Sequence, residues 1–144
     1  MSTTTKSHAT DLRNPLARAR GLGSAHEGLH HWWAQRLTAL ALIPLTLWFV
    51  VAIVRLVHGQ FGGTGGASYE DFLGWLASPI NATLMVVFIA VSFHHAVLGM
   101  QVVIEDYVHA HGLKVAALRL SQFAHVLVAA AGIYPVLKIA FGAH

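Results

Sequence analysis

Two adjacent histidines, His94 and His95, lie inside an apolar run that ends in the polar residues Asp106 and Tyr107. His95 and Asp106 are 11 residues apart, so on a straight helix they differ by about 20° around the axis and lie roughly 16 Å apart along it. Gly99, one turn after His95, leaves room for a flat ligand on nearly the same face. The spacing predicts an imidazole near the middle of a membrane, suited to a haem, and a carboxylate close to one membrane surface.

The two histidines cannot serve one cofactor together, because adjacent helical residues point about 100° apart. The opening at Gly99 favours His95 as the ligand, which leaves His94 to packing or to a hydrogen bond on another face. The alternative for either histidine is a hydrogen bond to a neighbouring membrane helix. His125, in a later apolar run, has no matching polar companion, and we expect a structural role for it.

Asp106 and Tyr107 stand where the apolar run meets water. A quinone under reduction needs a hydrogen-bond donor to its carbonyl oxygen and a nearby source of protons. A tyrosine hydroxyl supplies the first, and an acid such as Asp106 can deliver protons or orient the donor. An ordinary solvated helix end is the alternative, although a carboxylate at a helix C-terminus is slightly unfavourable.

The composition indicates a membrane protein. Of the 144 residues, 56% are hydrophobic and 10% are charged, whereas a soluble domain carries about 25% charged residues. There are no cysteines, which excludes disulfides, thiolate metal sites, covalent c-type haem attachment and iron–sulfur ligation by this chain. The nine Lys and Arg residues are scattered and mostly flank apolar spans, so we expect no nucleic-acid partner. Nothing in the chain can bind flavin or oxidise a dicarboxylate, so we expect no catalysis by the chain alone.

The hydropathy pattern predicts an all-α membrane protein with three transmembrane helices, over about residues 32–57, 80–104 and 115–141. Each stretch has the roughly 20 apolar residues that a crossing requires. Residues 1–28 form a polar tail, residues 29–144 form the three-helix domain, and a short interfacial helix capped by Ser68 lies between the first two spans. Three helices enclose little interior, so we expect a partner subunit and a larger heteromeric helical bundle.

The distribution of positive charge predicts the orientation. The N-terminal tail holds four Lys and Arg residues, and Lys114 and Arg119 flank the start of the third span, whereas the opposite side has Arg55 and Lys138. The positive-inside rule therefore places the N-terminus and the Asp106 end in the cytoplasm or matrix, and the C-terminus outside.

Three stretches carry a family resemblance. HHAVLGMQVVIEDYV (residues 94–108) resembles the signature of the small hydrophobic anchor subunit of succinate dehydrogenase, respiratory complex II. GLHHWWAQRLTAL (residues 28–40) resembles the family's first-span entry, and SYEDFLGWLAS (residues 68–78) its segment before the second span. That family carries a haem-ligating histidine followed 11 and 12 residues later by Asp and Tyr, at the positions of His95, Asp106 and Tyr107.

The resemblance implies a membrane anchor that shares one haem b with a partner subunit and helps to form the site where electrons from succinate reduce ubiquinone. His95 would be one axial ligand of the haem iron. Tyr107 would hydrogen-bond a quinone carbonyl, and Asp106 would hold nearby groups or protons. Arg36, and with it His30, would contact haem propionates or the quinone pocket.

The implied partners are a second membrane anchor of the cytochrome b556 type, an iron–sulfur subunit and a flavoprotein subunit. The tail resembles no transit segment, which favours the inner membrane of a bacterium over that of a mitochondrion. Two alternatives stay open. One is a cytochrome b-type anchor of another quinone-linked dehydrogenase or of a fumarate reductase, and the other is a haem-free structural or assembly subunit.

Overall fold

The computed structural model describes residues 24–59 and 68–142 of the chain. These ranges contain four helices and no strand: α2 (Ser24–Val57), α3 (Tyr69–Ala77), α4 (Pro79–Tyr107) and α5 (His111–Ala140). Three stretches are long and apolar enough to cross a membrane: Leu29–Val57, Pro79–Tyr107 and His111–Ala140. The predicted fold class, all-α with three transmembrane helices, is confirmed.

The helices begin or end a few residues away from the predicted limits. α4 continues to Tyr107, three residues beyond the predicted span, so Asp106 and Tyr107 are helical. α2 begins at Ser24, inside the segment predicted as a polar tail, while residues 1–23 of that tail lie outside the described residues. Polar residues continue these helices past the apolar stretch because helix ends lie in the headgroup region, where water and lipid satisfy them.

The chain divides into two compact units, residues 1–33 and residues 34–144. In the first unit the described residues belong to the start of α2, where the rings of Trp32 and Trp33 meet edge to face with centroids 5.1 Å apart. The second unit holds the rest of α2 together with α3, α4 and α5.

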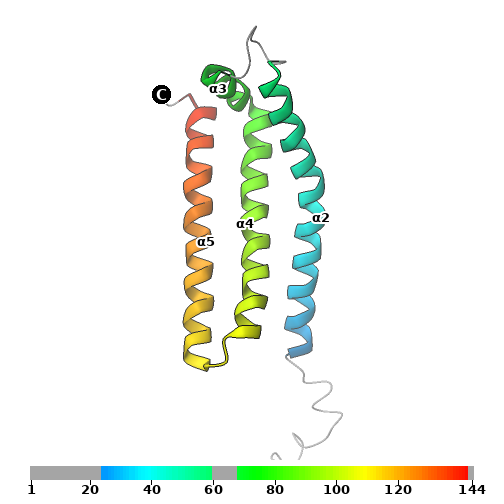
Figure 1. Ribbon diagram of the computed structural model, residues 1–144, viewed down its shortest axis with the longest axis vertical. Helices are drawn as coiled ribbons and strands as arrows, with labels where there is room; N and C mark the ends of the chain where they lie inside the picture. Colours follow the sequence, from blue (N-terminus) through cyan, green and yellow to red (C-terminus); the bar gives the residue numbers. More distant parts are fainter. Residues whose placement is uncertain (1–23, 60–67, 143–144) are drawn as a thin grey trace, which may run out of the picture. The chain divides into compact units, whose positions relative to one another are not determined.

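Helices α4 and α5 run side by side in opposite directions (Figure 1), joined by a connection of only three residues, 108–110. At this connection Lys114 Nζ donates to the backbone carbonyl of Glu105 at 2.9 Å. A cation at the last turn of α4 offsets the negative end of the helix dipole. Farther along, Gly132 of α5 faces Ile89 of α4, and a methyl group added there would lie in ordinary van der Waals contact with Ile89 Cγ2, at 3.7 Å.

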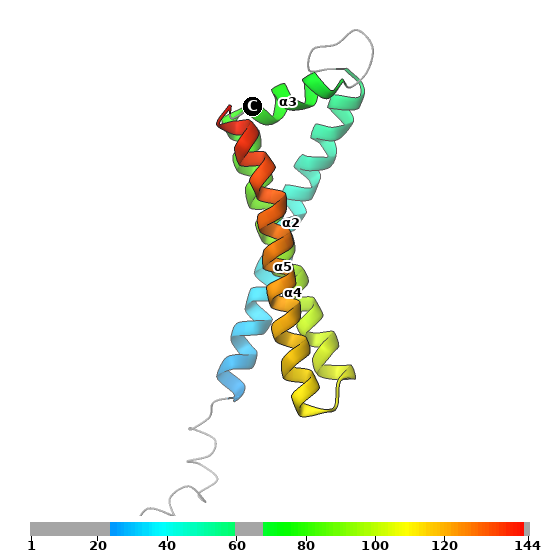
Figure 2. The ribbon, with the colours of Figure 1, turned by 90° about the vertical axis from the view of Figure 1, so that its left-hand side faces the viewer.

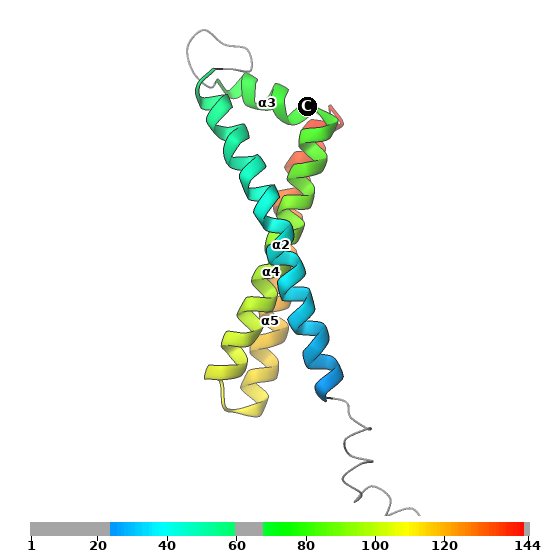
Figure 3. The same ribbon diagram turned by 90° about the vertical axis from the view of Figure 1, so that its right-hand side faces the viewer.

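Helix α2, from Ala34 onward, crosses α4 at an angle instead of lying along it (Figures 2 and 3). Its contacts with α4 are therefore made by a few side chains. One of these contacts is between the rings of Phe49 in α2 and Phe88 in α4, which stack with centroids 5.1 Å apart.

The buried core of the second unit is gathered at the end where α3 lies. Trp75 of α3 is buried, and its ring stacks on Trp48 of α2 with centroids 5.9 Å apart. The half of α4 that leads to Tyr107 contains one buried side chain, Leu98, and it is not part of that core. Thus one end of the bundle is packed within the chain and the other end is open. The core residues are Ala52, Leu56, Trp75, Leu76, Ala82, Met85 and Val136.

Ser68 caps the start of α3, as the sequence predicted, and the structure shows that it does so in a capping box with Asp71. Ser68 Oγ accepts a hydrogen bond from the Asp71 backbone N–H at 3.1 Å, and the Ser68 backbone N–H donates to Asp71 Oδ2 at 3.1 Å. The Ser68 hydroxyl also donates to this carboxylate at 2.7 Å. These hydrogen bonds, first from the side chain and then from the backbone of Ser68, lower the pKa of Asp71 from its usual 3.8. The stabilisation is therefore present at neutral and mildly acidic pH and is lost only as the pH falls through that lowered pKa.

Replacing Ser68 by alanine should destabilise the start of α3 by about 1 kcal/mol, because the first turn loses its side-chain cap. Hydrogen–deuterium exchange of the peptide covering residues 68–77 in detergent should then become faster. Ser78→Ala is the matched control, since Ser78 precedes α4 without a side-chain capping hydrogen bond. Equal exchange in Ser68→Ala and the parent protein would show that the box does not hold this helix.

Candidate functional site

The adjacent histidines of α4 point to different neighbours. His95 is partly buried and faces α2, where its Nδ1 lies 2.9 Å from Thr38 Oγ1 in a hydrogen bond. These residues are 57 positions apart in the chain. His95 is 12 residues before the end of the 29-residue α4, or about 18 Å along the axis. A polar contact between two membrane helices therefore lies near mid-span.

The other ring nitrogen of His95 is open. Within the described residues Nε2 makes no hydrogen bond. Among the described residues, Nε2 of His31 is the one side-chain nitrogen or oxygen that is buried and has no hydrogen-bond partner. Nε2 of His95 has no partner either, so it must be accessible and not buried. One turn farther on, a methyl group added to Gly99 would meet nothing within 4 Å. Both observations leave space for a ligand beside His95 and Gly99.

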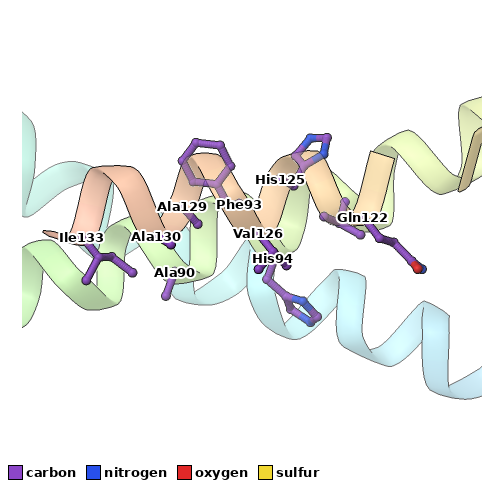
Figure 4. Close-up of a pocket in the computed structure, with 10 residues that line it drawn as sticks. Ala90, Phe93, His94, Gln122, His125, Val126, Ala129, Ala130 and Ile133 are labelled. Atoms are coloured by element: carbon purple, nitrogen blue, oxygen red, sulfur yellow. The ribbon is translucent and has the colours of Figure 1, made fainter. Parts of the chain in front are cut away.

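His94 is exposed and lines a groove of about 490 Å³ between α4 and α5. Figure 4 shows its ring and that of His125 pointing to different sides of this groove. His125 Nδ1 donates to the carbonyl of Ser121 at 2.8 Å, and its ring meets Phe93 edge to face at 6.2 Å. His125 is thus bonded within α5, in line with the structural role that we expected. Besides the two histidines the groove is lined by Ala90, Phe93, Val97, Gln122, Val126, Ala129, Ala130 and Ile133.

Asp106 and Tyr107 end α4. Both are exposed, Tyr107 to 78%, and within the described residues neither side chain makes a hydrogen bond. A helix of 29 residues is about 43 Å long, which exceeds the roughly 30 Å of the hydrocarbon core, so its last turn reaches the headgroups. Just before this last turn, Gln101 Nε2 donates to Glu105 Oε1 at 2.8 Å, four residues farther along the helix. A hydroxyl and a carboxylate are thus presented together at an ordered helix end.

Arg36 and His30 lie on α2, on two different units of the chain. Arg36 is exposed, and two residues of helix turn its position about 200° from Thr38, away from the side that meets His95. His30 is exposed and belongs to the first unit. Of the predicted site residues in the second unit, His95 contacts Thr38, and Asp106 and Tyr107 are neighbours at the end of α4.

Thr38 was missed in the sequence. Its only signal there is a hydroxyl inside an apolar stretch, and such residues often hydrogen-bond across membrane helices. No group of three or more His, Cys, Asp or Glu side chains suited to a metal ion occurs among the described residues. Any metal at His95 would therefore need its other ligands from outside this set.

Fold and site together define an integral membrane protein of three spans with an open imidazole in one of them. Residues 10–134 match the family of succinate dehydrogenase/fumarate reductase transmembrane subunits. The chain belongs to this family, and the family resemblance read from the sequence is confirmed.

Known relatives agree with this assignment. The succinate dehydrogenase hydrophobic membrane anchor subunit of Paracoccus denitrificans is 33% identical over 129 residues, which cover 90% of this chain and 93% of the relative. The same subunit of Rickettsia bellii is 36% identical over 105 residues, 72% of this chain and 77% of the relative. A fumarate reductase subunit of Mycobacterium tuberculosis is 33% identical over 73 residues, 46% of this chain and 56% of the relative. No solved structure matches the chain significantly.

Proposed function

We propose that this protein is the membrane anchor subunit of a succinate dehydrogenase, that it binds one b-type haem together with a second membrane subunit, and that it forms part of the ubiquinone reduction site. The observation that carries the proposal is the state of His95. One ring nitrogen is hydrogen-bonded inside the chain, and the other is open near the middle of a membrane helix.

The donor set fits a haem b. A neutral imidazole with an open Nε2 is a common axial ligand of haem iron, and ligating histidines usually hydrogen-bond through the other nitrogen. His95 would hold the haem iron through Nε2, and the partner subunit would supply a second ligand. When bound, the haem provides one-electron redox chemistry within the bundle. The open space at Gly99 admits the edge of a flat macrocycle.

The last turn of α4 serves the quinone. Reduction of a quinone to a quinol consumes two electrons and two protons, so the site needs a hydrogen-bond donor and a proton source. The Tyr107 hydroxyl donates to a carbonyl oxygen of the quinone, and the exposed Asp106 carboxylate passes protons from water or orients the donor. The electrons come from succinate through the flavoprotein and iron–sulfur subunits, which dock at this membrane face.

Arg36 and His30 are groups that bind anions, because the guanidinium carries a positive charge and the imidazole can donate a hydrogen bond. A haem carries two propionates, and an arginine fork binds carboxylates well. We assign Arg36, with His30, to the haem propionates or to the rim of the quinone pocket.

The open half of the bundle is the place for the second membrane subunit. Lipid accounts for exposed apolar side chains, but it offers no partner for the exposed His94 or for Nε2 of His95. Polar groups at that depth favour a protein or cofactor over hydrocarbon. The core at the α3 end, by contrast, is already closed by this chain.

Fumarate reductase is the second candidate, because the matching family includes its transmembrane subunits. The match to the relative of that name covers 46% of this chain, whereas the match to the Paracoccus anchor subunit covers 90%. The longer match favours a succinate dehydrogenase in a bacterial inner membrane.

Replacing His95 by alanine should remove the low-spin b-type signal from the reduced-minus-oxidised optical spectrum of the complex purified from native membranes. His94→Ala is the matched control, because it removes a neighbouring imidazole that faces the α4–α5 groove, and its spectrum should stay unchanged. Flavin content reports that both complexes assemble. A haem signal that survives His95→Ala would refute the ligand assignment, and a haem-free parent complex would favour a structural anchor.

Tyr107→Phe should lower the rate of ubiquinone reduction by about tenfold, the effect of losing a hydrogen bond worth about 1.4 kcal/mol. Haem content and succinate oxidation with a soluble dye should not change, because the flavin and iron–sulfur groups lie in other subunits. Tyr69→Phe provides the control, since Tyr69 is similarly exposed, to 72%, and begins α3 at the opposite end of α4. Normal quinone turnover in Tyr107→Phe would place Tyr107 outside the site.

The orientation can be tested with single cysteines, because the chain has none of its own. His58 and His109 are exposed and lie just beyond opposite ends of the membrane spans. In intact spheroplasts a membrane-impermeant maleimide should label His58→Cys and spare His109→Cys, because positive charge retains the His109 side in the cytoplasm. The reverse pattern would invert the topology and move the quinone site to the outer face.

A further inference from the structure

Thr38 is held in a hydrogen-bond geometry that fixes the direction of its hydroxyl proton. Its Oγ1 lies 2.8 Å from the carbonyl oxygen of Ala34, 3.1 Å from that of Gln35 and 2.9 Å from Nδ1 of His95. A threonine hydroxyl has one proton to donate and two lone pairs to accept with. The two carbonyl oxygens can only accept, so they compete for that proton.

The protonation of the His95 ring follows from this competition. If Nδ1 carried a lone pair, the hydroxyl proton would have to point at it, and two oxygen atoms would face each other at 2.8 Å without a hydrogen between them. If Nδ1 carries the proton, it donates to Oγ1 while the hydroxyl donates to the carbonyl of Ala34, and each contact is satisfied. The neutral ring is therefore protonated at Nδ1, and Nε2 carries the lone pair.

We propose that Thr38 is a positioning residue for the haem ligand, which accepts the Nδ1–H of His95 so that Nε2 presents its lone pair to the iron in one ring orientation. This inference rests on the proposed role of His95. The hydrogen bond joins α2 to α4, so it also fixes how α4 is rotated against α2 at this point. An acceptor behind the ligating ring raises the electron density on the ligating nitrogen.

The nature of the acceptor has a consequence for the redox potential. A hydroxyl is neutral, so it pulls less strongly on the Nδ1 proton than a carboxylate does and gives the ring less anionic character. A neutral ligand supports the ferric state less than a partly anionic one. Loss of even this weak acceptor makes the ligand poorer in electrons, which raises the midpoint potential of the haem.

The test compares Thr38→Val with Thr38→Ser in the complete complex. Valine has nearly the shape of threonine but accepts no hydrogen bond, whereas serine keeps the hydroxyl. In Thr38→Val we expect a displaced or broadened low-spin ferric EPR signal, a higher midpoint potential and about tenfold weaker retention of haem through detergent washing. Thr38→Ser should restore the parent values. Thr46→Val is the matched control, because Thr46 is an exposed threonine of α2 that, within the described residues, makes no hydrogen bond to α4.

Each outcome is decisive. Unchanged EPR signal and potential in Thr38→Val, or equal changes in Thr38→Val and Thr38→Ser, would overturn the positioning role. If Thr38→Val does not assemble, Thr38→Ala is measured in its place, and failure of both to assemble would assign Thr38 to folding alone. A parent complex with haem that His95→Ala abolishes keeps the ligand role intact even when the Thr38 result is negative. Absence of haem from the parent complex refutes both.

Discussion

The hydrocarbon core of a membrane offers no hydrogen-bond partner, and this constraint governs the structure. Helices satisfy the backbone within each span, so the remaining cost falls on polar side chains. Thr38 and His95 avoid the cost of unpaired polar groups because they hydrogen-bond to each other, with Oγ1 2.9 Å from Nδ1. His94, one residue earlier, has no such partner in the described part of the chain and lies on the α4–α5 groove. The contrast separates a histidine whose ring is held by a hydrogen bond to another helix from one whose ring is not.

The distribution of packing divides the bundle into an end that holds the fold and an end that is left open. Stacked rings of Trp48 and Trp75, and of Phe49 and Phe88, tie α2 to α3 and α4 on one side. Toward Tyr107, α4 has one buried side chain, Leu98, and the bond from Lys114 to the Glu105 carbonyl joins α5 to the end of α4. A half of the bundle that closed on itself would have no room for a flat cofactor. The haem site that we propose, shared with a second subunit, therefore requires this half of the bundle to be open.

The parts of this structure that depend on nearby residues could be predicted from the sequence. The three spans follow from apolar length, and the N-cap of α3 follows from Ser68 with acidic residues in the turn after it. The choice of His95 over His94 stays a prediction that rests on the spacing to Asp106 and on Gly99. Thr38 could not be found in this way, because its pairing depends on how α2 crosses α4, with 57 positions between the two residues. The predicted second span ends at about residue 104, whereas α4 continues to Tyr107, because hydropathy falls before the helix stops.

One continuous helix carries both halves of the proposed site. α4 has no proline after its first residue, so His95 and Tyr107 are separated by 12 residues of regular helix, about 18 Å along the axis. Their separation along the axis and their relative rotation are therefore coupled, because a single inserted residue would turn Tyr107 by about 100° relative to His95. The Thr38 hydrogen bond fixes the rotation at one point, and the bond from Lys114 to the Glu105 carbonyl holds the terminus. The orientation of the proposed ligand His95 and the position of the proposed donor Tyr107 are thus set by the same helix. A rotation of α4 would change both.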